Sequence, residues 1–497
     1  MAKKGLTPRL AEAGPGAGKT HAMVDEIAAA INVLPPHRFL AAITYTHAAA
    51  NTIRERLSKK VPIRRNVFIG TNHSFMNRFI LAPFAELLSL FPAEHIYAPI
   101  NVHEKGRKAS AAYAYTKNLI KKGIVPYDEM VSNARVILKY PSIRDRICER
   151  LAYIFVDEFQ DANIGMLEVF DCFRKAGKTN LYVVGDPEQY VMSFAYRGQP
   201  PPSHDNIPFF RFKKSAQQIP ILENYRSNGE IVTFANQFRG ELKQTAIKPK
   251  RNEPRVLFIP ATDLEIIVLQ FQQLSADVEA KDSQRTRLYI SEDNATFDSV
   301  CDQFQLAPIS NIGRRTKTLL GDTLELLSVA LDRSPKRVCE EYQLARLQWR
   351  AIGIQLLNEL RKDLYDFKKL EAFVAQKFGI KIRDRSAKEL EKDLSLFRSE
   401  LIRGTSKSSS ELYASIRKAK GLEADAVLVV AKTNSDLKKW LQTDSSCRSA
   451  DKQDKCRLGY VAFTRPREML CIASLKELDT ESVGMLDSLG VVTSYGA

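Results

Sequence analysis

The chain has 497 residues, of which 44% are hydrophobic and 27% charged, and its formal net charge is +16 at pH 7. This length and composition exclude collagen-like, low-complexity and mainly disordered proteins, and they predict about three or four compact units. No apolar run approaches the roughly 20 residues of a transmembrane helix, and the basic, glycine-rich start is unlike a signal peptide. We therefore expect a cytoplasmic protein with no membrane partner, whose excess positive charge favours a polyanionic partner such as nucleic acid.

From Arg9 to about Lys213, short apolar runs alternate with helical stretches, which is typical of an α/β unit with a parallel sheet. Between Phe75 and Arg150 the pattern becomes helical and basic, which predicts an inserted helical subdomain. The strands predicted in this part are Arg9–Ala13, Phe39–Thr44, Val67–Gly70, Tyr153–Val156 and Leu181–Val184.

A link rich in proline and serine, at 199–204, leads into a second α/β region. This region is interrupted from Arg333 to Lys407 by a helical stretch with 18 lysines and arginines against 11 acidic residues. Such a charge surplus fits a nucleic-acid-binding face and a solvated amphipathic bundle equally well. The strands predicted in the second region are Val256–Ile259, Arg287–Ile290, Ala426–Val430 and Leu470–Ala473.

The segment Ala13-Gly-Pro-Gly-Ala-Gly-Lys-Thr20 lies between a predicted strand and a helix predicted over His21–Ile31, which is the context of a P-loop. Its glycines let backbone N–H groups surround phosphate oxygens. Lys19 supplies positive charge for the β and γ phosphates, and Thr20 offers its hydroxyl to Mg²⁺. The predicted nucleotide-binding residues are Gly14, Pro15, Gly16, Ala17, Gly18, Lys19 and Thr20 of this segment, and His21 directly after it.

Two adjacent acids, Asp157 and Glu158, end a predicted strand. An isolated pair of this kind is more often a solvated strand end, but a P-loop upstream favours metal-assisted hydrolysis. In that chemistry Asp157 holds Mg²⁺ and Glu158 deprotonates the attacking water. Gln189 follows another predicted strand, where it can reach the γ-phosphate, and Arg226 and Arg465 can bring positive charge to the transition state.

The order of these motifs resembles that of the UvrD/Rep-like superfamily 1 helicases along almost the whole chain. Further matching segments are Thr44–Ala50, Gly70–Phe75, Asn224–Ser227, Tyr413–Glu423 and Tyr460–Arg465. The resemblance implies an α/β protein with two RecA-like P-loop NTPase lobes, each with a parallel sheet and an inserted helical subdomain. The implied bounds are 1–75 with 150–214 for the first ATP-binding lobe, 76–149 for its helical insert, 215–332 with 408–497 for the second lobe, and 333–407 for its basic helical insert.

The resemblance also implies roles for individual residues. The implied cofactors are ATP and Mg²⁺, with Lys19, Thr20 and Asp157 binding phosphate and metal. Glu158 would be the catalytic base, Gln189 would sense the γ-phosphate, and Arg226 and Arg465 would be arginine fingers. Tyr225 would stack on adenine, and Glu423 would contact the ribose. The residues implied to contact single-stranded DNA are Thr46, His47, Thr71, His73, Phe194, Tyr196 and Arg197.

Several positions depart from the family's pattern. None of the 18 residues before Lys19 is the glutamine that reads adenine in the family, and His21 stands where an arginine usually packs on the base, so base selectivity stays open. Arg417 replaces a histidine, Pro466 replaces a small residue, and the segment Tyr190–Tyr196 is longer by about two residues than the family's pattern.

The implied activity is that of a DNA-dependent ATPase that moves along single strands, with helicase activity and 3′→5′ polarity. The compact length, the missing upstream glutamine and the residues before His73 most resemble the UvrD-like subunit of Gabija anti-phage defence. That resemblance implies a protein partner, an OLD-family nuclease of the GajA type. The alternative is a nucleotide-gated sensor of DNA ends that regulates a partner nuclease with little unwinding.

Overall fold

The computed structural model describes residues 6–91, 96–98, 109–121, 124–193, 202–240, 242–249, 253, 255–278, 285–309, 319–331, 335–360, 366–382, 394 and 410–494. Contacts divide the chain into two compact units, Met1–Ile309 with Ser410–Ala497, and Ser310–Ser409. None of the helices described combines the length and the hydrophobicity needed to cross a bilayer.

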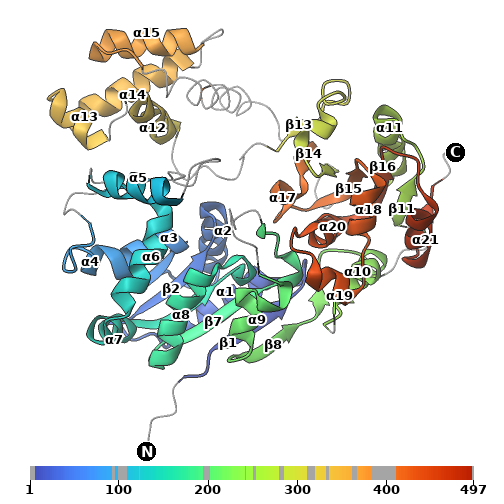
Figure 1. Ribbon diagram of the computed structural model, residues 1–497, viewed down its shortest axis with the longest axis horizontal. Coiled ribbons are helices and arrows are strands. Elements are labelled where there is room, and N and C mark those ends of the chain that lie inside the picture. Colours follow the sequence, from blue (N-terminus) through green and yellow to red (C-terminus); the bar gives the residue numbers. More distant parts are fainter. Residues whose placement is uncertain are drawn as a thin grey trace, which may run out of the picture. The chain divides into compact units, whose positions relative to one another are not determined.

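The first unit contains a six-stranded sheet in which every strand pairs in parallel, in the order β3-β2-β6-β7-β1-β8 (Figure 1). Its inner strands are largely buried on both faces, and β2, β6 and β7 accordingly read as mainly apolar runs. β1 is also an inner strand, but it carries Arg9 and Glu12. The strands are β1 (Arg9–Ala13), β2 (Phe39–Thr44), β3 (Val67–Thr71), β6 (Leu151–Val156), β7 (Asn180–Gly185) and β8 (Gln217–Ile221).

Helices cover both faces of this sheet. On one face, Met23 and Ile27 of one helix pack with Phe155 and Tyr182, and on the other face Phe170 packs with the alternate strand residues. The main covering helices are α1 (Lys19–Asn32), α2 (His47–Ser58), α3 (Asn72–Met76), α8 (Ile164–Ala176) and α9 (Pro208–Lys213). We refer to this sheet and these helices as the first lobe.

The same unit contains a seven-stranded sheet, again parallel throughout, in the order β13-β14-β12-β15-β16-β11-β17. The strands are β11 (Val256–Ile259), β12 (Arg287–Ser291), β13 (Ala307–Pro308), β14 (Glu411–Ser415), β15 (Ala424–Ala431), β16 (Pro466–Ser474) and β17 (Val492–Thr493). The helices around it are α10 (Gly229–Asn236), α11 (Leu264–Leu274), α17 (Ile416–Ala419), α18 (Asn434–Trp440), α19 (Ser445–Ala450), α20 (Lys455–Phe463) and α21 (Thr480–Ser488). We call this assembly the second lobe. Both lobes have the parallel, helix-covered architecture of RecA-like lobes.

Smaller elements complete the first unit. A two-stranded parallel ladder joins β9 (Glu223–Asn224) to β10 (Thr245–Ala246). Between β3 and β6 lie β4 (Ile96–Ala98), β5 (Ile124–Pro126), α5 (Ala109–Lys121), α6 (Tyr127–Leu138) and α7 (Pro141–Arg150), a mainly helical stretch as predicted.

The second unit is helical over its described residues. Its helices are α12 (Leu319–Ala330), α13 (Pro335–Glu341), α14 (Arg346–Leu360) and α15 (Phe367–Phe378). They share a core that includes Leu327, Trp349, Leu356 and Val374. The predicted basic insert falls inside this unit, and the exact domain bounds stay predictions.

Every strand predicted from sequence is present, and the structure adds β8, β13, β14 and β17 to the two large sheets, with the short strands β4, β5, β9 and β10 outside them. The added strands are short or polar. β8 reads Gln-Gln-Ile-Pro-Ile, and at the sheet edge it leaves Gln217, Gln218 and Pro220 exposed. Proline is tolerated there because an edge strand need not donate every N–H.

Gly459 of α20 tests the packing of the second lobe. A Cβ at this position would lie 2.5 Å from the carbonyl oxygen of Trp440 and 2.6 Å from its Cα, so an alanine must displace backbone. We expect Gly459→Ala to cost about 1–3 kcal/mol of stability. Gly484→Ala in α21 meets open space and should instead stabilise by up to about 1 kcal/mol. Thermal melts of both variants check this, and equal melting temperatures would contradict it.

Candidate active site

The P-loop turn follows β1 and leads into α1. Gly16 (φ 74°) and Gly18 (φ 73°) adopt the left-handed conformation that favours glycine. A Cβ on Gly16 would lie 2.6 Å from Asn224 Oδ1 and 2.7 Å from Arg226 Cβ, so the segment that leads into the second lobe approaches the turn closely. The first N–H groups of α1 follow Gly18, as in helix N-terminal phosphate sites. The helix starts at Lys19 and not at His21 as predicted, because Gly18 caps it.

Lys19 lies inside the loop. Its Nζ donates to the carbonyl oxygens of Gly14 at 3.2 Å and Ala13 at 3.4 Å. Burial lowers the pKa of the ammonium, although Glu158 and Asp186 act in the opposite direction. The charge is therefore placed where P-loops bind phosphate oxygens.

Asp157 follows β6 and is held by hydrogen bonds on three sides. Its N–H donates to Ile43 O at 2.9 Å, its Oδ2 accepts from Thr20 Oγ1 at 3.2 Å, and its Oδ1 accepts from the Glu158 N–H at 2.9 Å. Burial, with the neighbouring Glu158 carboxylate, raises the pKa of Asp157 to about 7. A buried hydroxyl and carboxylate side by side are the hard oxygen donors that suit Mg²⁺.

Glu158 has an uncommon backbone for its residue type, with φ at 50°. The amide of Gln160 donates to its Oε2. Burial alone would raise its pKa, but Lys19 and Lys420 outweigh that effect, so the pKa lies below its usual value. Glu158 therefore carries an ionised carboxylate beside the P-loop.

Two arginines of the second lobe reach this site. Arg465 is buried, and its NH2 donates to Gln189 Oε1 at 3.3 Å while its Nε donates to Val461 O at 2.7 Å. Burial and the neighbouring Arg226 lower the pKa of Arg465 to about 9, which leaves it protonated at neutral pH. Arg226 Nε donates to Glu423 Oε2 at 2.7 Å.

Three predicted base and ribose contacts have their own partners. Glu423 also accepts from Arg467 NH2 at 2.8 Å, so its carboxylate lies between two arginines. The backbone N–H of Tyr225 donates to Gly16 O at 3.0 Å, and its ring is exposed. The exposed imidazole of His21 lies 3.6 Å from the Asp25 carboxylate.

Lys420 is a site residue that was not predicted from the sequence. Its Nζ donates to Asp161 Oδ1 and Oδ2 at 2.6 and 2.7 Å, and to Gln189 O at 3.0 Å. Lys420 lies within Tyr413–Glu423, one of the segments that resemble the family, but nothing in the sequence pairs it with Asp161. They form an ion pair between the lobes beside the acid pair.

The predicted DNA residues of the first lobe lie after β2 and β3. Thr46 caps α2 by accepting from the Ala49 N–H at 3.1 Å, and Thr71 caps α3 by accepting from the Ser74 N–H at 3.3 Å. His47 begins α2. The ring of His73 stacks on Tyr127 with centroids 4.9 Å apart. Phe194, Tyr196 and Arg197 lie outside the residues that the structure describes.

The departures from the family's pattern include one contact between the lobes. Arg417 NH1 donates to Val191 O at 2.6 Å, at the start of the longer segment. Pro466 begins β16, and its carbonyl accepts from Ser227 Oγ at 2.7 Å. Each has a structural role, and Arg417 joins α17 to the chain after β7.

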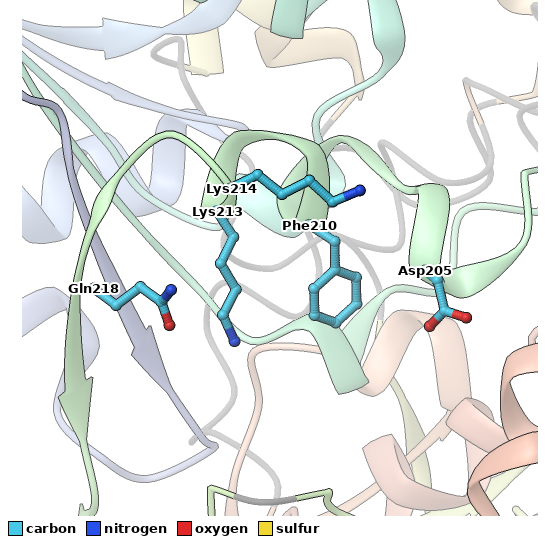
Figure 2. Close-up of a pocket in the computed structure, with 5 residues that line it drawn as sticks. All are labelled: Asp205, Phe210, Lys213, Lys214 and Gln218. Carbon is cyan, nitrogen blue, oxygen red and sulfur yellow. The ribbon is translucent and has the colours of Figure 1, made fainter.

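A surface hollow of about 380 Å³ lies beside α9 and β8 (Figure 2). It is lined by Asp205, Phe210, Lys213, Lys214 and Gln218. Lys213 is paired with Glu12 at 2.7 Å. None of these residues belongs to the constellation around the P-loop, so the hollow is separate from the candidate active site.

A P-loop lysine, an acid pair at the carboxyl edge of one parallel sheet, and arginines from a second parallel sheet define a two-lobed P-loop NTPase fold. In comparisons with known proteins, the UvrD/REP helicase N-terminal domain matches residues 2–105 and 85–199. The matched part of the chain is therefore similar to the N-terminal domain of UvrD/REP helicases, which supports a UvrD-like superfamily 1 helicase.

Individual relatives agree with this family. Gabija protein GajB of Bacillus cereus (strain VD045) is 27% identical over 289 residues, which cover 55% of this chain and 55% of that protein. ATP-dependent DNA helicase Rep of Buchnera aphidicola subsp. Acyrthosiphon pisum (strain APS) is 27% identical over 281 residues, or 46% of this chain and 42% of Rep. Rep of Escherichia coli (strain K12) is 24% identical over 278 residues, or 46% and 40%. The chain spans about half the length of the curated relatives it matches.

The raised pKa of Asp157 predicts a stability effect. Between about pH 4 and pH 7 the folded protein keeps a proton that the unfolded chain has lost, so this group's contribution to stability falls as pH rises through that window. We expect Asp157→Asn to melt several degrees (about 2–4 °C or more) above wild type at pH 8, with little difference near pH 4. Melting curves across this range, with the exposed Asp277→Asn as control, measure it. A variant less stable than wild type at pH 8 would contradict the assignment.

Proposed function

We propose that the chain is an ATP-dependent DNA translocase or helicase of the UvrD-like type, which hydrolyses ATP between its two lobes while it tracks single-stranded DNA. One observation carries the proposal. Arg465 of the second lobe donates to Gln189 of the first at 3.3 Å, within a site that also holds Lys19 and the acid pair. Hydrolysis is thereby linked to the contact between the lobes, as a motor requires.

The proposed chemistry uses residues of both lobes. Lys19 and the N–H groups of the P-loop bind the β and γ phosphates. Glu158, ionised beside Lys19, accepts a proton from the attacking water, and Arg226 and Arg465 neutralise the charge that develops on the transferred phosphoryl group. Thr20 and Asp157 would hold Mg²⁺, which supplies further charge neutralisation when bound.

The proposed DNA track crosses the carboxyl edge of the first sheet. Thr46, His47, Thr71 and His73 follow β2 and β3, and parallel strands end at the same sheet edge. Phe194, Tyr196 and Arg197, which follow β7 in sequence, are proposed to add stacking and phosphate contacts. The net charge of +16 favours binding to a polyanion.

The catalytic base is tested by Glu158→Gln. The amide keeps the size of the side chain but cannot accept the proton, so we expect the ATPase rate to fall by about 100-fold or more while nucleotide binding remains. Glu149→Gln, a change of an exposed glutamate, is the matched control. Turnover of Glu158→Gln at the wild-type rate, measured at saturating ATP, would exclude Glu158 as the base.

Similarity to GajB supports the further proposal that this translocase is the helicase subunit of a Gabija-type anti-phage defence complex with an OLD-family nuclease as partner. The second candidate is a nucleotide-gated sensor of DNA ends that regulates a partner nuclease and unwinds little. Both candidates use the same ATP site, and they differ in whether hydrolysis drives stepping.

The two candidates differ in how ATPase rate depends on DNA length. A translocase spends a growing share of its time stepping on longer single strands, so its steady-state rate should keep rising well beyond the length that fills the binding site. A sensor should plateau at that length. Rates measured on single strands of increasing length separate them, and the same series repeated with the nuclease added shows whether the partner changes the outcome. An absence of stimulation at every length, with and without the nuclease, would count against both.

A further inference from the structure

The carboxylate of Asp186, which follows β7, is fully buried and receives hydrogen bonds from both lobes. From the first lobe, Gln189 Nε2 donates to Oδ2 at 2.9 Å and the Glu188 N–H donates to Oδ1 at 3.2 Å. From the second lobe, Arg239 NH1 donates to Oδ1 at 3.2 Å and the Tyr460 hydroxyl donates to Oδ2 at 3.3 Å. All four hydrogen bonds are accepted by the two carboxylate oxygens of Asp186, which are fully buried.

This carboxylate decides which way the amide of Gln189 faces. An ionised carboxylate only accepts hydrogen bonds, so Gln189 must present its NH₂ group to Asp186. Its Oε1 then faces Arg465, which donates to it at 3.3 Å. If the Gln189 amide were reversed, its oxygen would face an oxygen of Asp186 and its NH₂ group would face the guanidinium of Arg465. Neither pair could form a hydrogen bond. The orientation of the proposed γ-phosphate sensor therefore depends on the Asp186 carboxylate being held in place beside it.

Arg239 supplies the positive charge that is paired with the buried carboxylate of Asp186. It follows α10, its side chain is almost completely buried, and it forms an ion pair with Asp186. NH1 also donates to the Tyr460 hydroxyl at 2.6 Å, and Nε donates to Leu242 O at 2.7 Å. The three side chains close a triangle, because Tyr460 in turn donates to Asp186.

Arg239 also touches the P-loop turn. A Cβ on Gly14 would lie 2.8 Å from Arg239 NH1, so the guanidinium rests against the backbone at the start of the loop. One arginine of the second lobe thus contacts both the phosphate-binding turn and the carboxylate that orients Gln189.

We propose that Arg239 is a positioning residue of the ATP site, which acts through Asp186 to fix the Gln189 amide so that its oxygen meets Arg465. This inference rests on the proposed ATPase function. It assigns to the chain after α10 a role beyond packing, because loss of Arg239 would free Gln189 to turn away from the arginine that completes the site.

The experiment is a double-mutant cycle of DNA-stimulated ATP hydrolysis with wild type, Arg239→Met, Gln189→Ala and the double variant. We expect Arg239→Met to lower kcat about tenfold or more with little change in KM for ATP, because binding to Lys19 and the loop is retained. In the Gln189→Ala background the same change should cost less than about threefold, because its target is already gone. Arg239→Lys, which keeps the charge, should recover part of the rate.

Controls separate positioning from folding. Arg287→Met breaks a partly buried ion pair with Glu411 in the second lobe and should lower the melting temperature while leaving kcat unchanged. If Arg239→Met does not fold, Tyr460→Phe removes one hydroxyl of the triangle and carries the same cycle, with a loss of about threefold to tenfold in kcat. Equal losses in both backgrounds would overturn the inference and leave the proposed function standing. A folded wild-type protein without DNA-stimulated hydrolysis would overturn both.

Discussion

Charges buried around the P-loop must be neutralised by partners, because an unpaired ion in a protein interior costs several kcal/mol. The first lobe contributes Asp157, Glu158 and Asp161 to this region, which is more acid than Lys19 alone can balance. Lys420 comes from the second lobe, as does Arg465. The buried charges of the site are therefore balanced only when residues of both lobes contribute.

The same burial explains how much of the fold the sequence could predict. β2 is predicted to the residue, because a strand covered on both faces is mainly apolar. β1 is also predicted to the residue although it carries Arg9 and Glu12, and the glycine-rich P-loop that follows marks its end. β8 and β14 were not predicted, because Gln217–Ile221 and Glu411–Ser415 carry polar residues whose strand conformation comes from pairing with a neighbour. Pairing with neighbouring strands, and not the residues of the segment itself, makes these segments strands.

The site residues likewise divide into those that the sequence predicts and those that only the fold brings to the site. Lys19, Asp157 and Glu158 lie within short contiguous motifs, so spacing alone predicts them. Lys420 pairs with Asp161 across 259 residues, and a lysine or arginine in a sequence is by default a surface residue. Only the arrangement of the two sheets places such cations in the interior. Pairings of this kind need the fold before they can be predicted.

The passage of the chain between the lobes has a mechanical consequence. β8 completes the first sheet at Ile221, and after Leu222 the chain enters β9 and then α10 of the second lobe. This crossing segment itself binds the P-loop, since Asn224 Nδ2 donates to Pro15 O at 2.9 Å. The covalent tether between the lobes therefore lies beside the phosphate site. If the second lobe rotated about this tether, atoms near the P-loop would move least and the distant edges of that lobe would move furthest, so a small displacement at the P-loop would be amplified by leverage.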